Sequence, residues 1–90
     1  MTSATTMLLP KKNRSRQEII CDVLESANEP TPKSHLLSKA HISWPQLLSY
    51  LLLLQRTCMI EEMEAGNYCT TDKGIRYLKI YYRLKRELEN

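Results

Sequence analysis

The sequence has no phenylalanine, only two glycines and four prolines, and three cysteines in 90 residues. So little glycine and proline excludes collagen-like and low-complexity chains, and the length suits one small domain. The cysteines, Cys21, Cys58 and Cys69, are odd in number and widely spaced, which argues against a disulfide framework. We therefore expect reduced and mostly buried thiols in an intracellular protein.

Apolar runs long enough to cross a membrane are also missing. The longest, ISWPQLLSYLLLLQ at residues 42–55, contains no acid and no base but includes Gln46 and Ser49. A membrane span needs roughly 20 predominantly apolar residues, so this run is expected to be a helix of a soluble protein. The N-terminal MTSATTMLLP lacks the charged region of a secretory signal, which favours a cytoplasmic protein.

Motifs of catalysis and metal binding are absent as well. His35 and His41 accompany the three cysteines without C-x-x-C or H-x-x-x-H spacing, so no metal site is expected. The chain has no phosphate-binding loop and no dinucleotide fingerprint, and His41 with Cys58 would need an orienting group and a pocket to act as a nucleophile–base pair. We expect no cofactor and no enzymatic activity.

The charge that is present is unevenly distributed. Residues 1–16 carry four bases and no acid, residues 17–64 carry three bases and seven acids, and residues 65–90 carry six bases and three acids. Positive ends around a negative middle predict that a polyanion would meet the two ends of the chain.

Helix signals divide the chain. Ser15 and Glu18 form a capping box ahead of a helix that ends near residue 27, followed by a short helix at 31–39 with Thr31 as its cap and Pro32 at its first position. Residues 40–42 form a tight turn, and Ser43 caps a helix that runs to about residue 56. The turn at residues 65–67 predicts a two-stranded hairpin of residues 59–64 and 67–70. Thr71 then begins a helix that can reach the C-terminus.

Helix, short helix, turn, helix, hairpin and helix is the order of a winged helix-turn-helix. Three blocks, RSRQEIICDVLESA, SKAHISWPQLLSYLLLL and TTDKGIRYLKIYYRL, resemble signature blocks of the small archaeal winged helix-turn-helix DNA-binding proteins, in the same order and spacing. The resemblance covers about residues 14–84. It implies a dimeric, DNA-binding, transcription-regulator-like protein, and it implies a capped start at Thr71 with close backbone packing at Gly74.

In the helix at 43–56, helical periodicity separates a core side from an outer side. The predicted core stripe is Leu47, Leu51, Leu54 and Cys58, with Trp44, Leu48 and Gln55 beside it. The outer side holds Gln46, Ser49, Leu53 and Arg56, with Pro45 and Tyr50 at its edges. In a major groove, Gln46 could bond an adenine edge, Ser49 a base or phosphate, and Tyr50 a phosphate. The alternative is that Gln46 and Ser49 are ordinary solvated side chains and Leu53 simply exposed.

The last helix carries three stripes. Ile75, Leu78 and Tyr82 are predicted to pack back on the domain. Tyr77, Tyr81, Leu84 and Leu88 have coiled-coil spacing and predict a homodimer interface, unless the two tyrosines only cover the first helix. Arg76, Lys79, Arg83 and Arg86 form a basic row that either contacts DNA phosphates or is a solvated face.

The fold expected is mainly α with a small β-hairpin: a basic arm (1–13), a winged helix-turn-helix domain (14–71) and a dimerisation helix (72–90). The expected function is double-stranded DNA binding by a small, nucleoid-associated transcriptional regulator or chromatin-like protein. The residues expected to contact DNA are Lys11, Lys12, Arg14, Arg16, Lys33, Lys39, Ser43, Gln46, Ser49, Tyr50, Arg76, Lys79, Arg83 and Arg86. Glu61, Glu62 and Glu64 make the wing acidic, which favours the alternative of a protein-interaction module that uses the wing and the tyrosine-rich helix.

Overall fold

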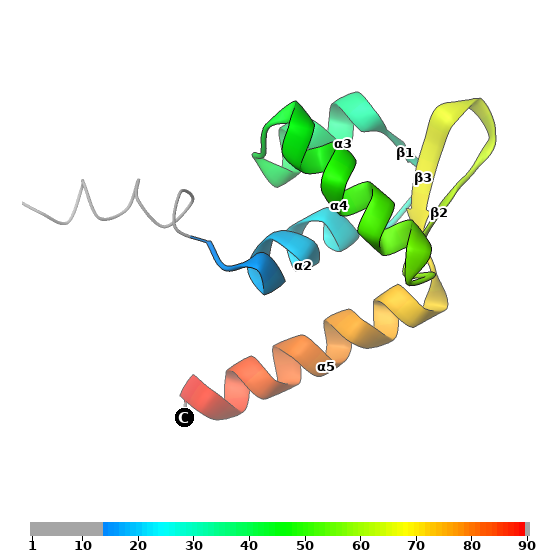
Figure 1. Ribbon diagram of the computed structural model, residues 1–90. Coiled ribbons are helices and arrows are strands. Elements are labelled where there is room, and N and C mark those ends of the chain that lie inside the picture. The colour runs from blue at the N-terminus through cyan, green and yellow to red at the C-terminus, as the bar shows by residue number, and fades with distance from the viewer. Residues whose placement is uncertain (1–13, 90) are drawn as a thin grey trace, which may run out of the picture.

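The computed structural model describes residues 14–89, which form helices packed on one face of a small sheet (Figure 1). The elements are α2 (Arg16–Ser26), β1 (Thr31–Pro32), α3 (Lys33–Ala40), α4 (Trp44–Arg56), β2 (Ile60–Glu62), the 3₁₀ turn η2 (Glu64–Gly66), β3 (Asn67–Thr70) and α5 (Asp72–Glu89). This order confirms the predicted fold class. Over residues 14–89, none of the helices combines the length and the apolar character that crossing a membrane requires.

The core lies where α2, α3 and α4 meet the sheet and the first half of α5. Leu24 of α2, Leu36 of α3, and Leu47 and Leu54 of α4 are completely or almost completely buried. Burying each such side chain contributes about 1.5–3 kcal/mol to folding. The α2 helix is capped by Ser15, whose hydroxyl accepts the Glu18 N–H while the Glu18 carboxylate accepts the Ser15 N–H. The predicted capping box is therefore present.

The sheet has three strands in the order β1-β3-β2, all antiparallel. The predicted hairpin is its β2–β3 part, and the third strand was not expected. Thr31 pairs with Tyr68 of β3, so the prediction that Thr31 caps a helix is wrong. Its hydroxyl donates to the carbonyls of Ser26 and Glu29 instead, and α3 starts two residues later without a side-chain cap.

The start of α5 is joined to the end of α4. The Thr71 hydroxyl accepts the Gly74 N–H (3.2 Å) and donates to the carbonyl of Cys58 (2.6 Å), and the Lys73 ammonium donates to the carbonyl of Thr57 (2.8 Å). A Cβ at Gly74 would lie 2.4 Å from the Met59 carbonyl oxygen. The cap and the close packing expected at Thr71 and Gly74 are therefore both present.

Beyond this joint, α5 runs alongside α2 (Figure 1). Leu78 is buried, Ile75 packs against the core, and the Tyr82 hydroxyl donates to the Glu25 carboxylate of α2. Partial burial of the ring, together with this hydrogen bond, raises the pKa of Tyr82 well above its ordinary value. Every residue at positions 83–89 is exposed, so the last two turns of α5 extend past the core.

Replacing Gly74 with alanine tests the joint. Alanine in a helix interior ordinarily stabilises by about 1 kcal/mol over glycine, but here the added methyl group would overlap the Met59 carbonyl. We expect Gly74→Ala to lower the free energy of unfolding by about 2 kcal/mol, measured by urea unfolding followed by circular dichroism. The exposed Glu87→Ala in the same helix should stay within about 0.5 kcal/mol of the parent. A Gly74→Ala variant that is more stable than the parent would contradict the close packing of Gly74 against the Met59 carbonyl.

Candidate nucleic-acid interface

The turn between α3 and α4 is held from outside by Arg14. His41 ends α3 in the left-handed conformation, with φ of 55°. The Arg14 guanidinium donates to the carbonyls of Ala40 (2.8 Å) and His41 (2.7 Å) and pairs with Asp22. Its side chain is only 10% exposed. These contacts let Arg14 fix the helix-turn-helix turn, and its expected contact with DNA stays a prediction.

At the start of α4 the predicted cap is present and more elaborate than expected. The Ser43 hydroxyl accepts the Gln46 N–H (3.3 Å), and the Gln46 side-chain oxygen accepts the Ser43 N–H (3.0 Å). Glutamine at the third helical position completes a capping box, a signal that Ser43 and Gln46 already carried in the sequence. Ser43 and Gln46, both expected to contact DNA, are therefore also bonded to each other.

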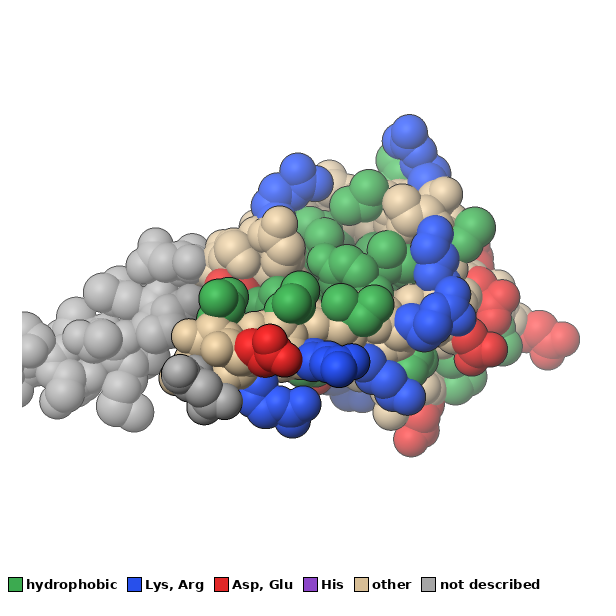
Figure 2. All heavy atoms as spheres, turned by 90° about the horizontal axis from the view of Figure 1, so that it is seen from below, with side chains coloured by type: hydrophobic (Ala, Val, Ile, Leu, Met, Phe, Trp, Pro, Cys, Tyr) green, Lys and Arg blue, Asp and Glu red, His purple; other side chains and the backbone are tan. Residues whose placement is uncertain are grey.

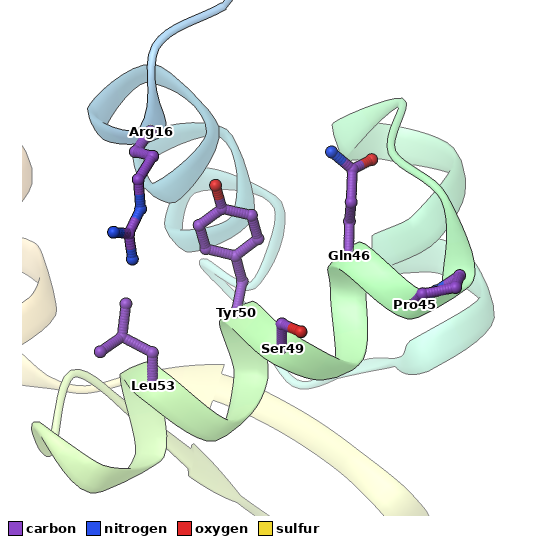
Figure 3. Close-up of a pocket in the computed structure, with 6 residues that line it drawn as sticks. All are labelled: Arg16, Pro45, Gln46, Ser49, Tyr50 and Leu53. Atoms are coloured by element: carbon purple, nitrogen blue, oxygen red, sulfur yellow. The ribbon is translucent and has the colours of Figure 1, made fainter.

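One side of α4 borders an open hollow of about 340 Å³. It is lined by Arg16, Pro45, Gln46, Ser49, Tyr50 and Leu53. In Figure 3, Arg16 reaches from α2 toward Leu53, and the Tyr50 ring stands beside it. Leu53, expected to be simply exposed, is half-buried at this edge. The hollow brings together Arg16, Gln46, Ser49 and Tyr50, four of the residues expected to contact DNA.

The other side of α4 differs from the expectation. Trp44 and Leu48, predicted to lie beside the core stripe, are 46% and 41% exposed, and Leu52 is also exposed. These three side chains, four residues apart, form an apolar strip on α4 that no element among residues 14–89 covers. Cys58 is not in the core, because α4 ends at Arg56 and Cys58 lies beyond it, exposed, with φ of 63°.

The cysteines differ in environment. Cys21 is buried, as expected, and burial is the main reason that its pKa rises to about 12. Cys69 is half-buried and Cys58 is exposed, so the expectation of buried thiols holds fully for Cys21 alone. No group of three or more potential metal ligands is found within residues 14–89.

On α5, the residues of the predicted basic row, Arg76, Lys79, Arg83 and Arg86, are all exposed. Of the predicted dimer interface, Leu84 and Leu88 are exposed, while Tyr77 and Tyr81 are half-buried against the core. Ile80, which was assigned to none of the predicted stripes, is also exposed. Residues four apart are neighbours on a helix surface, so the spacing of Ile80 and Leu84 could have identified Ile80 as part of the same apolar surface. Figure 2 shows hydrophobic side chains in a strip across this face of the molecule, with Lys and Arg side chains beside it.

The remaining predicted contacts are scattered. The Lys33 ammonium lies 5.8 Å from the centre of the Tyr68 ring, and Lys39 is exposed on α3. Lys11 and Lys12 lie outside the described residues. The wing glutamates, Glu61, Glu62 and Glu64, are exposed, as the sequence suggested for an acidic wing.

A family model described as winged helix-turn-helix matches residues 13–89. The chain belongs to the winged helix-turn-helix family. This winged helix-turn-helix chain is also similar in structure to Sso10a-2, a DNA-binding protein from Sulfolobus solfataricus, with a TM-score of 0.71 over 84% of this chain and 86% of that one, at 20% sequence identity. No curated protein matches this winged helix-turn-helix sequence.

Within this winged helix-turn-helix domain, the role of Arg14 can be separated from that of its neighbour. Arg14→Gln should lower the free energy of unfolding by about 2 kcal/mol, because two turn carbonyls and Asp22 lose a charged partner. Arg16→Gln, at an exposed position on the hollow, should change it by less than about 0.5 kcal/mol. Urea unfolding of both variants measures this, and equal effects would show that Arg14 does not hold the turn.

Proposed function

We propose that this protein binds double-stranded DNA as a homodimer, as a small transcriptional regulator or chromatin-like protein. The observation that carries the proposal is the exposed side of α4, where Gln46 and Ser49 line one hollow together with Arg16 on a helix-turn-helix frame. In such frames the second helix of the motif enters the major groove, and its N-terminal residues contact base edges. A solved structure with the same fold is that of a DNA-binding protein.

The affinity comes from charge outside α4, whose only charged residue is Arg56 in its last turn. We assign phosphate contacts to Arg16, to the basic row of α5, to Lys39 and to the arm residues Lys11 and Lys12. Helical periodicity places the basic row and the apolar strip of α5 on different sides of the helix. A partner packed on the apolar strip therefore leaves the row free to contact a polyanion.

The proposed dimer forms through α5. Its C-terminal turns carry Leu84 and Leu88 beyond the core, with Leu88 88% exposed, and Ile80 and the half-buried Tyr77 and Tyr81 continue the same surface toward the domain. A second copy of α5, related by a twofold axis, would cover this surface with an identical one. The coiled-coil spacing of these residues suits such a pair.

A second candidate is a protein-interaction module. The acidic wing supports it, because Glu61, Glu62 and Glu64 would repel phosphates if the wing lay on DNA. The apolar strip of Trp44, Leu48 and Leu52 supports it too, since exposed apolar patches rimmed by polar residues often bind proteins. The two candidates are separated by DNA binding that depends on salt and on the basic row of α5, which only the first candidate predicts.

DNA binding is tested by the salt dependence of affinity for mixed-sequence duplex. If about five of the eight basic side chains assigned to phosphate contacts neutralise phosphates in each subunit, log K should fall with log salt with a slope of about −4 to −5 per subunit. Changing Arg76, Lys79, Arg83 and Arg86 together to glutamate should weaken binding strongly and flatten the slope, by about 0.9 for each phosphate that is no longer neutralised.

The control for net charge is a matched pair on α5, Arg83→Glu in the row and Lys85→Glu outside it. Both change the charge equally, but only the first should weaken binding clearly. A slope near zero for the parent would rule out the proposed function, and equal effects of the pair would rule out the role of the row.

The dimer is tested by Leu84→Glu, which places a charge in the proposed interface. The parent should have the mass of a dimer at micromolar concentration by light scattering, and the variant that of a monomer with unchanged helix content, because Leu84 is exposed and lies outside the core. Glu87→Lys, an exposed change of charge in the same turns, should remain dimeric. A monomeric parent would refute the α5 interface.

A further inference from the structure

The Gln46 side chain has two hydrogen-bonding ends, and the structure uses only one of them. Its oxygen accepts both the Ser43 N–H (3.0 Å) and the Ser43 hydroxyl (3.2 Å). A carbonyl oxygen has two lone pairs, so this oxygen is fully engaged. Within residues 14–89, its amide nitrogen takes part in no hydrogen bond. Figure 3 shows the nitrogen on the side of Gln46 nearer Tyr50 and Arg16, with the oxygen on the other side.

This arrangement restricts which base edges Gln46 can meet. The usual pairing of glutamine with adenine is bidentate: the oxygen accepts from the N6 amino group while the nitrogen donates to N7. Here both lone pairs of the oxygen are taken, so accepting from N6 would displace either the Ser43 hydroxyl or the Ser43 N–H. The Ser43 N–H is an otherwise unpaired donor at the start of α4. The adenine contact expected from the sequence therefore competes with the cap of the helix that makes it.

The amide nitrogen of Gln46 offers a partner two N–H donors and no acceptor. In the major groove, guanine presents the acceptors O6 and N7 and thymine presents the acceptor O4, whereas the acceptor N7 of adenine lies next to its N6 amino donor. The amino groups of adenine and cytosine would place a donor against these donors, and a buried donor without an acceptor weakens binding.

We propose that Gln46 is a specificity-determining residue that recognises the keto oxygen of guanine or thymine, with Ser43 as the positioning residue that holds it in the donor-only orientation. This inference rests on the proposed function, because it assumes that α4 lies in a major groove. It adds which base edges are selected and which residue sets the choice.

The first experiment is selection of binding sites from randomised duplex DNA by the full chain. Comparison with Gln46→Ala identifies the base pair whose preference depends on Gln46. Gln46→Glu preserves the capping box, since glutamate is a usual partner in it, but presents an acceptor instead of a donor. We expect Gln46→Glu to prefer the inverted base pair at that position, which places an amino group where the parent met a keto oxygen. Gln55→Glu, the same change at an exposed position in the last turn of α4, should keep the parental preference.

The second experiment uses the preferred site with a base analogue that lacks the major-groove amino group of that base pair. A donor-only Gln46 does not use this group, so affinity should stay within about twofold, whereas a bidentate adenine contact would lose about tenfold. A tenfold loss, or a parental preference retained by Gln46→Glu, overturns the inference. DNA binding without any base preference also overturns it and leaves the proposed function standing. If the parent binds no DNA even at low salt, the proposed function fails, and the inference falls with it.

Discussion

The joint between α4 and α5 is the contact on which the rest of the molecule depends. The carbonyls of Thr57, Cys58 and Met59, which follow α4, accept from the Lys73 ammonium, the Thr71 hydroxyl and the Thr71 N–H. Carbonyls at the end of a helix need such partners when water does not supply them. Because the joint is made of short, direct hydrogen bonds and a glycine contact, the direction of α5 is set by that of α4. The orientation of α4 relative to α5 is therefore already fixed before any partner binds α5.

The opposite end of α4 is fixed by different means. Arg14 holds the carbonyls of the preceding turn, and the Ser43–Gln46 box holds the first N–H groups of the helix. With both ends held and Leu47, Leu51 and Leu54 buried, α4 has little freedom to adjust. A rigid helix with an almost uncharged outer face is suited to recognising a partner by its shape and its pattern of hydrogen-bond donors and acceptors. Long-range attraction must then come from other parts of the chain.

The sequence predicted what depends on neighbours along the chain. The caps at Ser15, Ser43 and Thr71 require residues only three positions apart, and all are present. Thr31 and Pro32 carry an equally good local signal for a helix start, but pairing of Thr31 with Tyr68, far along the chain, prevails. The end of α4 near Arg56 was predicted, and placing Cys58 on its core stripe extended the helical period beyond that end. Periodicity could not show that residues 14–89 leave the Trp44 side of α4 uncovered, because this depends on tertiary contacts. The hollow beside Arg16 was missed for the same reason.

Residues 14–89 carry an exposed apolar strip on α4 and another on α5, and the surroundings of the two strips differ. The strip on α5 continues the core through Tyr77 and Tyr81 and ends on turns that nothing in residues 14–89 covers, as expected for a surface completed by a second helix. The strip on α4 lies instead on a helix whose neighbouring side offers donors, at Gln46 and Ser49. Leucines there can meet the methyl group of thymine, and the donor-only Gln46 can meet a keto oxygen. Thymine carries both groups in the major groove, so the apolar character of α4 is compatible with base recognition by a helix that has no charge in its first three turns.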